Sequence, residues 1–313
     1  MSRPTPTTPG STVGPLPGWS RLTQLAPGVL SGEVGPTSLT TSSRVPGAPP
    51  VIAPRVGWPA VERGSGVPLV FLHGYPLNHA MWLPLLDSLP SGTLAVLLDL
   101  PGYGLAEDWP IPETLAGYSE SVYRSIAGRF RGPVVLVGHS FGGYLTLQLY
   151  QDHPDQFRGL VLTNTRSQAD SPEAREKRLA TVRRLEEPGQ SLDIEATARG
   201  LVAPRTWEAG GPVVEVARSM VRRARTPALR GTLKAMAGRP DLTPVLATIR
   251  VPSLVIWGEE DQLIPPAETR ALVARIPNAM GQGIPAAGHL PSVESPGRFL
   301  EALQALLLRV PSR

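Results

Sequence analysis

Short apolar runs recur along the chain from about residue 51, and most of them end at polar residues, glycine or proline. Continuous Val and Leu runs of this length are typical of strands in a parallel sheet that is buried on both faces. We therefore predict five core strands. They cover residues 68–72 (PLVFL), 94–98 (LAVLL), 133–137 (PVVLV), 159–162 (GLVL) and 253–257 (SLVIW).

Helical patterns lie between these runs, for example at residues 144–151 after the third run. The last helix is predicted to begin with Ser295 as N-cap and Pro296 in its first turn. Alternating strands and helices predict a doubly wound α/β domain with right-handed crossovers. The last helix carries one apolar stripe, formed by Phe299, Leu300, Leu303, Leu306, Leu307 and Val310.

The alternation is interrupted once, because residues 166–246 are helical, rich in Arg and Glu, and contain no strand-like run. Ligand crevices in open α/β sheets lie beyond the carboxyl ends of the strands. An excursion that leaves the end of the strand at 159–162 is therefore expected to cover this crevice as a helical cap. We predict a core in two parts, residues 51–165 and 247–313, with the cap at 166–246 between them.

Residues 1–50 are dominated by Pro, Gly, Ser and Thr. Such a segment cannot bury enough apolar surface to offset the entropy lost on ordering, so we expect a disordered tail. It lacks the apolar stretch of a secretory signal. A linker, an unrecognised targeting extension and sequence upstream of the true start remain open for it.

The composition narrows the class of protein. The chain has 313 residues, of which 41% are hydrophobic, and no cysteine, which excludes disulfides, thiolate metal sites and a cysteine nucleophile. A net charge of +4 is small beside the basic faces of nucleic-acid binders. No apolar run approaches the roughly 18 residues that would span a membrane. We expect a cytoplasmic protein with neither a nucleic-acid nor a membrane partner, and its oligomeric state stays open.

One motif points to chemistry. Gly138-His139-Ser140-Phe141-Gly142 has the form G-x-S-x-G, which alone is a weak signal. Here it follows the predicted strand at 133–137 directly and precedes the predicted helix at 144–151, which is the setting of a nucleophile elbow. We predict Ser140 as the nucleophile, against the alternative of an ordinary Gly-rich turn.

A serine nucleophile needs a base within hydrogen-bond reach, and the chain has five histidines. His139 adjoins the serine and is expected to point away from the crevice, and His153 at a helix end is expected on the surface. His73 more plausibly orders its loop, and His79 is a weak candidate for the pocket wall. His289 lies in a small-residue loop before the final helix, which fits the order Ser, acid, His. His289 is therefore the predicted base.

The acid that orients this histidine should follow a strand between Ser140 and His289. Glu259, Glu260 and Asp261 all follow the strand at 253–257, and physical reasoning leaves the choice among them open. The preceding strand ends in Thr163-Asn164-Thr165, which offers no carboxylate.

An oxyanion hole needs two backbone N–H donors near the serine. One is expected from Phe141, the residue after the nucleophile. The other is expected from the loop His73-Gly74-Tyr75-Pro76. Because Pro76 has no N–H and Gly74 lets the backbone approach closely, Tyr75 is the predicted second donor.

From about residue 61 to residue 310 the chain resembles the α/β-hydrolase superfamily, most of all its small, cofactor-free esterase, enol-lactonase and perhydrolase branch. The resemblance implies Asp261 as the acid and structural roles for Asp99 and His73. The matching pieces are Leu72-His73-Gly74-Tyr75-Pro76, Asp99-Leu100-Pro101-Gly102-Tyr103-Gly104, the elbow motif with Gly143, Gly258-Glu259-Glu260-Asp261, and Gly288-His289. The two leading antiparallel strands of the superfamily are not evident, because Pro54, Gly57 and Pro59 interrupt residues 51–62.

A serine at the elbow implies acyl transfer. Epoxide hydrolases and haloalkane dehalogenases resemble this chain but carry Asp at the position of Ser140. We expect a serine hydrolase of a small carboxylic ester or lactone, without metal or cofactor, since no metal-ligand cluster or nucleotide-binding loop is evident. Cofactor-free perhydrolysis of the haloperoxidase type, C–C bond hydrolysis and a slow-turnover receptor remain as alternatives.

Overall fold

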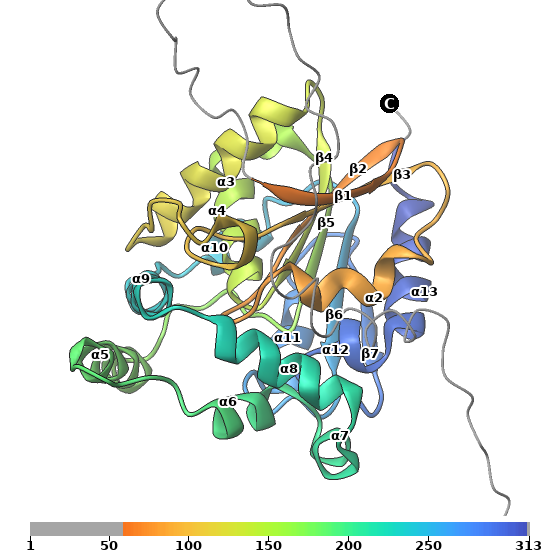
Figure 1. Cartoon of the computed structure of the whole chain (residues 1–313). Coiled ribbons are helices and arrows are strands. Elements are labelled where there is room, and N and C mark those ends of the chain that lie inside the picture. Colours follow the sequence, from red (N-terminus) through yellow and green to blue (C-terminus); the bar gives the residue numbers. More distant parts are fainter. Residues whose placement is uncertain (1–58, 312–313) are drawn as a thin grey trace, which may run out of the picture. The chain divides into compact units, whose positions relative to one another are not determined.

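The structure, a computed structural model, describes residues 59–311, and the tail expected at residues 1–50 lies outside this range. A seven-stranded sheet has the order β1-β3-β2-β4-β5-β6-β7 (Figure 1). β1 pairs antiparallel with β3, and every other neighbouring pair is parallel. The strands are β1 (Ala60–Gly64), β2 (Val67–Leu72), β3 (Thr93–Leu98), β4 (Val134–His139), β5 (Phe157–Thr163), β6 (Ser253–Gly258) and β7 (Met280–Ile284).

The five predicted strands are confirmed as β2 to β6, each within two residues of the predicted bounds at either end. The sequence did not predict β1 and β7, which form the two edges of the sheet. β1 reads AVERG and has no buried residue, and β7 reads MGQGI and buries only Ile284. Edge strands with so little apolar surface leave no run in the hydrophobic pattern.

Both faces of the sheet are buried, as the continuous apolar runs predict. Along β2, Leu69 and Phe71 belong to one core cluster, whereas Val70 and Leu72 belong to another. α3, α4 and α11 cover the second face, and α2, η2 and α13 cover the first. The elements around the core are η2 (His79–Trp82), α2 (Leu83–Leu86), η3 (Gly104–Ala106), α3 (Leu115–Arg129), α4 (Phe141–Asp152), η4 (Pro154–Gln156), α11 (Pro266–Val273), α12 (Pro291–Glu294) and α13 (Pro296–Leu307).

The last helix begins where the sequence predicts. Ser295 is the N-cap of α13 and Pro296 is its first residue, although the Ser295 side chain makes no capping hydrogen bond. Four members of the predicted stripe are buried against the sheet, namely Phe299, Leu300, Leu303 and Leu306. The apolar stripe therefore packs α13 against the same face of the sheet as η2.

A helical insertion, residues 166–246, separates β5 from β6, and no strand lies within it. α5 packs on α9, and α6 packs on α8. The Thr232 hydroxyl in α9 is hydrogen-bonded to the hydroxyls of Tyr103 (3.0 Å) and Tyr118 (3.1 Å) of the core. In Figure 1 the green and teal helices α5 to α9 gather at one end of the sheet. They are α5 (Pro172–Glu186), α6 (Ile194–Leu201), α7 (Pro204–Ala209), α8 (Pro212–Arg223) and α9 (Thr226–Ala237), and α10 (Thr243–Leu246) follows them.

A buried ion pair joins the two ends of this insertion. Asp170 and Arg239 have side chains that are each 1% exposed, and their charged atoms lie 2.8 Å apart. Arg178 and Arg166 also reach Asp170, at 2.6 Å and 3.3 Å. Burial alone opposes ionisation of Asp170, but the Arg178 hydrogen bond and the charges of Arg178 and Arg239 outweigh it and hold the pKa of this carboxyl below its usual range.

Replacing Asp170 by Asn is expected to lower the free energy of unfolding by about 3–5 kcal/mol, because a buried arginine loses its counter-charge. Urea denaturation at neutral pH measures this loss. Glu176→Gln in the exposed Glu176–Arg183 pair of α5 is the control, with an expected change below about 1 kcal/mol.

The same ion pair predicts a pH dependence. Because the folded-state pKa of Asp170 is depressed, its contribution is complete above the unfolded value of about 3.9 and is lost as the pH falls through the folded value. The stability difference between the parent and Asp170→Asn should therefore shrink in strong acid. A difference that stays constant at low pH would contradict this role of the carboxylate.

Candidate active site

Ser140 occupies a strained turn between β4 and α4. Its backbone angles are φ 51° and ψ −111°, outside the regions that residues with a side chain favour. Two hydrogen bonds hold the turn: the Ser140 N–H donates to the Thr163 carbonyl (2.9 Å), and the Ser140 carbonyl accepts from the Thr165 hydroxyl (2.9 Å). This strand–turn–helix geometry is the one that a nucleophile elbow requires.

The two glycines of the motif allow close approach around this turn. A Cβ at Gly138 would lie 2.2 Å from the Thr146 hydroxyl oxygen, and one at Gly142 would lie 2.4 Å from the Leu72 carbonyl oxygen. Both distances are too short for any side chain, so both positions require glycine. The turn therefore lies directly against the end of β2, where the loop that carries Tyr75 begins.

Asp261 and His289 form a buried pair. The His289 Nδ1 lies 2.7 Å from Asp261 Oδ2, and the two residues are 1% and 6% exposed. Because an ionised carboxylate only accepts hydrogen bonds, Nδ1 carries the proton and Nε2 is left as an acceptor. Asp261 Oδ1 accepts from the N–H groups of Leu263 (2.8 Å) and Ile264 (3.1 Å).

The surroundings of Asp261 favour its charged form. Burial opposes ionisation, but the charge and hydrogen bond of His289, with further hydrogen bonds from Asn164 and Leu263, hold the pKa of Asp261 below its usual value. A permanent carboxylate at this place keeps the imidazole in one tautomer and one orientation.

The other two acids of this loop have partners elsewhere. Glu259 accepts from the Trp257 indole N–H (2.9 Å) and faces Arg270. Glu260 pairs with Arg205 of α7. Within residues 59–311, Asp261 is thus the one carboxylate of the three that contacts His289.

His139, which was expected to point away from the crevice, packs against His289 and is hydrogen-bonded to its backbone. Its ring centroid lies 4.6 Å from that of His289, and its Nε2–H donates to the His289 carbonyl (2.6 Å). Burial, and then the charge of His289, hold the pKa of His139 well below its usual value. His139, the residue before Ser140, is therefore a neutral donor that ties the backbone of His289 to the serine turn.

Asn164 is a site residue that sequence reasoning passed over. Its side-chain N–H groups donate to Asp261 Oδ2 (2.7 Å) and to the Gly288 carbonyl (3.2 Å). Its φ of 45° lies in the left-handed region, which Asn tolerates better than most residues. This strand end holds no carboxylate, which was the feature sought there, but its amide steadies the carboxylate that follows the next strand, β6.

The loop after β2 is ordered by its own histidine. The Leu100 N–H donates to His73 Nε2 (2.9 Å), so Nδ1 carries the proton and donates to the Gly74 carbonyl (2.8 Å). A Cβ at Gly74 would lie 3.0 Å from the Ser140 Cβ, so the loop touches the serine turn. Among the described residues, no acceptor is hydrogen-bonded to the amides of Tyr75 and Phe141. Two unused backbone donors therefore lie beside Ser140, one in the loop after β2 and one at the first residue of α4.

Asp99 forms a second buried histidine–carboxylate contact away from the serine. Its Oδ2 lies 2.6 Å from His79 Nδ1 and accepts from the Leu105 N–H (2.7 Å), while Oδ1 accepts from the His79 N–H (2.6 Å). Burial opposes ionisation of Asp99, but the hydrogen bond and charge of His79 hold its pKa below the usual value. These bonds fix the loop after β3 against η2.

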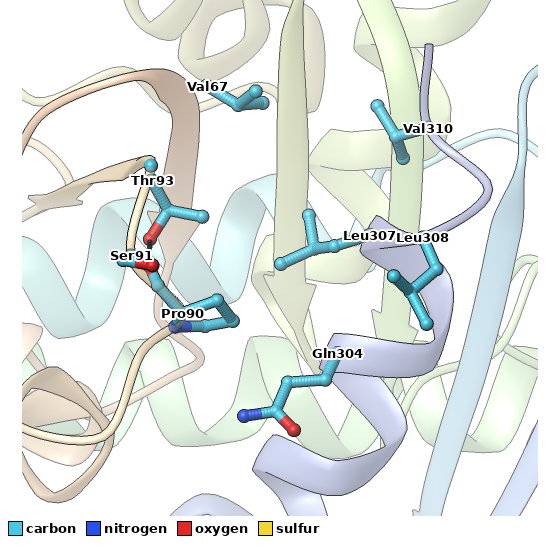
Figure 2. Close-up of a pocket in the computed structure, with 9 residues that line it drawn as sticks. Val67, Pro90, Ser91, Thr93, Gln304, Leu307, Leu308 and Val310 are labelled. Atoms are coloured by element: carbon cyan, nitrogen blue, oxygen red, sulfur yellow. Dashed lines mark hydrogen bonds between the residues drawn. The ribbon is translucent and has the colours of Figure 1, made fainter. Parts of the chain in front are cut away.

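A cavity of about 410 Å³ lies at the amino ends of β2 and β3, at the opposite end of the strands from Ser140 (Figure 2). Val67 and Thr93 begin β2 and β3, whereas Ser140 follows the end of β4, which is parallel to β2. This cavity therefore contains none of the predicted site residues. Its lining comprises Val67, Pro90, Ser91, Gly92, Thr93, Gln304, Leu307, Leu308 and Val310.

Within residues 59–311, no three His, Cys, Asp or Glu side chains are grouped so that they could hold a metal ion. None of the helices in this part of the chain combines the length and apolarity needed to cross a membrane.

The chain is similar to known proteins along most of its described length. A family model described as "Alpha/beta hydrolase family" matches residues 69–302. The chain is 32% identical over 263 residues to the pimeloyl-[acyl-carrier protein] methyl ester esterase of Xanthomonas campestris, a match that covers 79% of this chain and 98% of that relative.

Two solved structures are also similar. A thermophilic esterase from Thermogutta terrifontis superposes with a TM-score of 0.74 at 30% identity, over 80% of this chain and 92% of the other. An enol-lactonase from Burkholderia xenovorans gives a TM-score of 0.70 at 22% identity, over 80% and 96%. At that identity, the lactonase shows a shared fold alone.

Proposed function

Because the chain belongs to the alpha/beta hydrolase family, we propose that it hydrolyses a small carboxylic ester or lactone through an acyl-enzyme on Ser140. The observation that carries this proposal is the buried His289–Asp261 pair at 2.7 Å, joined through His139 to the strained turn of Ser140. The relatives named esterases support an ester as the substrate class. One of them is named for the methyl ester of a pimeloyl-carrier conjugate, so a methyl ester heads the substrates to test.

In the proposed reaction, Ser140 Oγ attacks the acyl carbon while His289 Nε2 takes the hydroxyl proton. Asp261 holds Nδ1–H and stabilises the imidazolium. The alcohol leaves with the proton from Nε2, and an acyl-enzyme remains. His289 then deprotonates a water molecule that attacks the acyl carbon, the bond to Oγ breaks, and the carboxylic acid departs as the proton returns to Ser140.

The negative oxygen of each tetrahedral intermediate requires donors that are already in place. We assign the amides of Tyr75 and Phe141 to this role. Tyr75 lies in the loop that contacts Ser140, Phe141 follows Ser140 as the first residue of α4, and both amides lack a protein acceptor among residues 59–311. Preorganised backbone donors stabilise the developing charge without reorganisation at the moment of reaction.

The helical insertion at residues 166–246 is proposed to cover the crevice above Ser140 as a cap. Its segment at residues 202–206 contacts the residues around His289 through Glu294. Its helix α9 is hydrogen-bonded, through Thr232, to the hydroxyls of Tyr103 and Tyr118. Selectivity among acyl groups would then come from the side chains that this insertion presents to the crevice.

Steady-state hydrolysis of p-nitrophenyl acetate tests the proposal. Continuous turnover is expected, with Ser140→Ala inactive. A panel of methyl esters, lactones, and hydrogen peroxide with acetate then separates ester hydrolysis from lactone hydrolysis and perhydrolysis. Release that stops after about one equivalent of p-nitrophenol per protein molecule would indicate a slow-turnover receptor instead.

Replacing Asn164 by glycine is expected to lower kcat by about tenfold to a hundredfold, because a hydrogen bond to a charged group contributes about 1.5–3 kcal/mol. Glycine keeps the left-handed backbone while removing the donor to Asp261. Asn278→Gly is the matched control, since Asn278 also has a positive φ (58°) and is exposed. Equal kcat values for the two variants would contradict a role of Asn164 at the site.

A further inference from the structure

Glu294, the last residue of α12, accepts hydrogen bonds from three donors that lie in two separate parts of the chain. Its Oε1 accepts from the Gly288 N–H (2.8 Å), next to His289. Its Oε2 accepts from the Ala203 N–H and from the Thr206 hydroxyl, both at 2.8 Å. One carboxylate thus joins the loop that carries His289 to the start of α7 in the helical insertion.

The two segments that Glu294 joins are also in direct backbone contact. A Cβ at Gly288 would lie 2.4 Å from the Ala203 nitrogen and 2.5 Å from the Val202 carbonyl carbon. Only glycine permits this approach, so no side chain separates the insertion from the loop that precedes His289. A shift of residues 202–206 would therefore be transmitted directly to the Gly288 peptide.

Glu294 completes a set of bonds around the backbone of His289. The Gly288 N–H donates to Glu294, the Gly288 carbonyl accepts from Asn164, and the His289 carbonyl accepts from His139. The three partners come from different elements: Glu294 from α12, Asn164 from the end of β5, and His139 from the end of β4. The orientation of the imidazole depends on all of them, because a reacting group must be held within fractions of an ångström.

The chemistry of Glu294 suits this task. Burial raises the pKa of its carboxyl, while the donors from Ala203, Thr206 and Gly288 favour the carboxylate and offset part of that rise. None of the ion pairs among residues 59–311 gives Glu294 a cationic partner. Uncharged donors therefore compensate for its burial, the three named above together with the Leu290 backbone. Loss of the two donors from the insertion would leave the carboxylate undersatisfied.

We propose that Glu294 is a positioning residue that seats the His289 loop on residues 202–206, so that the orientation of the catalytic base depends on the placement of the helical insertion. The role as base rests on the function proposed above. The coupling itself is a property of the fold that can be measured without turnover. Binding that displaces residues 202–206 would, through Glu294, also misalign His289.

Four variants test the coupling. Glu294→Ala removes all three bonds, and Glu294→Gln retains an oxygen acceptor but places an N–H₂ group against the remaining donors. Thr206→Val removes one bond and leaves the carboxylate in place. Arg205→Ala is the matched control, because Arg205 lies in the same segment but pairs with Glu260 in an exposed position.

We expect Glu294→Ala to lower kcat by about tenfold to a hundredfold with KM nearly unchanged, since a misplacement near 1 Å has that effect on rate. Glu294→Gln should fall between parent and Glu294→Ala, Thr206→Val should lose several-fold, and Arg205→Ala should match the parent. Proton NMR should show the downfield Nδ1 proton of His289 weakened by faster exchange in Glu294→Ala and retained in Arg205→Ala.

A lower melting temperature for Glu294→Ala with unchanged kcat and an unchanged His289 proton signal would overturn the positioning role. So would a kcat loss in Arg205→Ala as large as that in Thr206→Val. If the parent protein does not hydrolyse esters at all, the proposed function fails, but the NMR comparison still decides the coupling. A signal that persists equally in parent and Glu294→Ala would then count against it.

Discussion

Ser140→Ala is expected to lower kcat by about 10³-fold or more, with the fold intact, and His289→Ala to lower it by a similar factor. Removal of Oγ leaves no nucleophile, and removal of the imidazole leaves a hydroxyl that is not deprotonated at neutral pH. Because these groups act as one unit, the double variant should lose little more than either single variant. Steady-state hydrolysis of p-nitrophenyl acetate, with circular dichroism as the check on folding, measures the effect.

The control for this experiment is Ser125→Ala in α3. Ser125 is 2% exposed, and its hydroxyl has no hydrogen-bond partner among residues 59–311, so its loss should affect neither rate nor folding. Activity within about tenfold of the parent in Ser140→Ala or His289→Ala would remove that residue from the proposed mechanism.

Asp261→Asn is expected to lower kcat by roughly 10³- to 10⁴-fold. Both oxygens of Asp261 face donors: Oδ1 faces the N–H groups of Leu263 and Ile264, and Oδ2 faces His289 and Asn164. An asparagine side chain cannot accept hydrogen bonds from all four donors, because its N–H₂ group is itself a donor. With the N–H₂ end toward the histidine, Nδ1 must accept, and Nε2 then carries a proton and cannot take that of Ser140.

Glu259→Gln and Glu260→Gln are matched controls in the same loop and should stay near the activity of the parent. Glu259 faces Trp257 and Arg270, and Glu260 faces Arg205, so neither carboxylate touches His289. Loss of activity in either control that exceeds the loss in Asp261→Asn would move the acid to that residue. Melting temperatures of all three variants separate a rate effect from unfolding.

The hydrophobic pattern predicted the five buried strands because their two faces are both covered, so each reads as a continuous apolar run. It could not predict β1 and β7, whose exposed edges carry Glu62, Arg63, Gly281 and Gln282. The insertion was evident from the missing strand signal at 166–246. Its helices, however, are positioned by contacts such as Thr232 with Tyr103, more than a hundred residues apart in sequence.

The residues of the candidate site also fall into those that the sequence predicted and those that it did not. Ser140 was predicted from a local motif and His289 by elimination, whereas Asp261 followed from the family resemblance and not from physical reasoning. Asn164 and Glu294 were missed because their roles depend on partners 97 and 91 residues away along the chain, Asp261 and Ala203. A neutral amide and an acid in a short helix carry no local signature of such bonds. Their roles become evident only when the loops they join are placed together.

The ion pair between Asp170 and Arg239 has a consequence for how the helical insertion can be exchanged in this protein. This ion pair holds the first and last parts of the insertion together. The spacing of the two ends therefore does not depend on the number of residues between them. Helices between the two residues could be exchanged, added or shortened without moving β5 or β6. An exchange of residues 170–239 should therefore leave β5 and β6 in place, provided that the new segment keeps the contacts of residues 202–206 with Glu294 and Gly288.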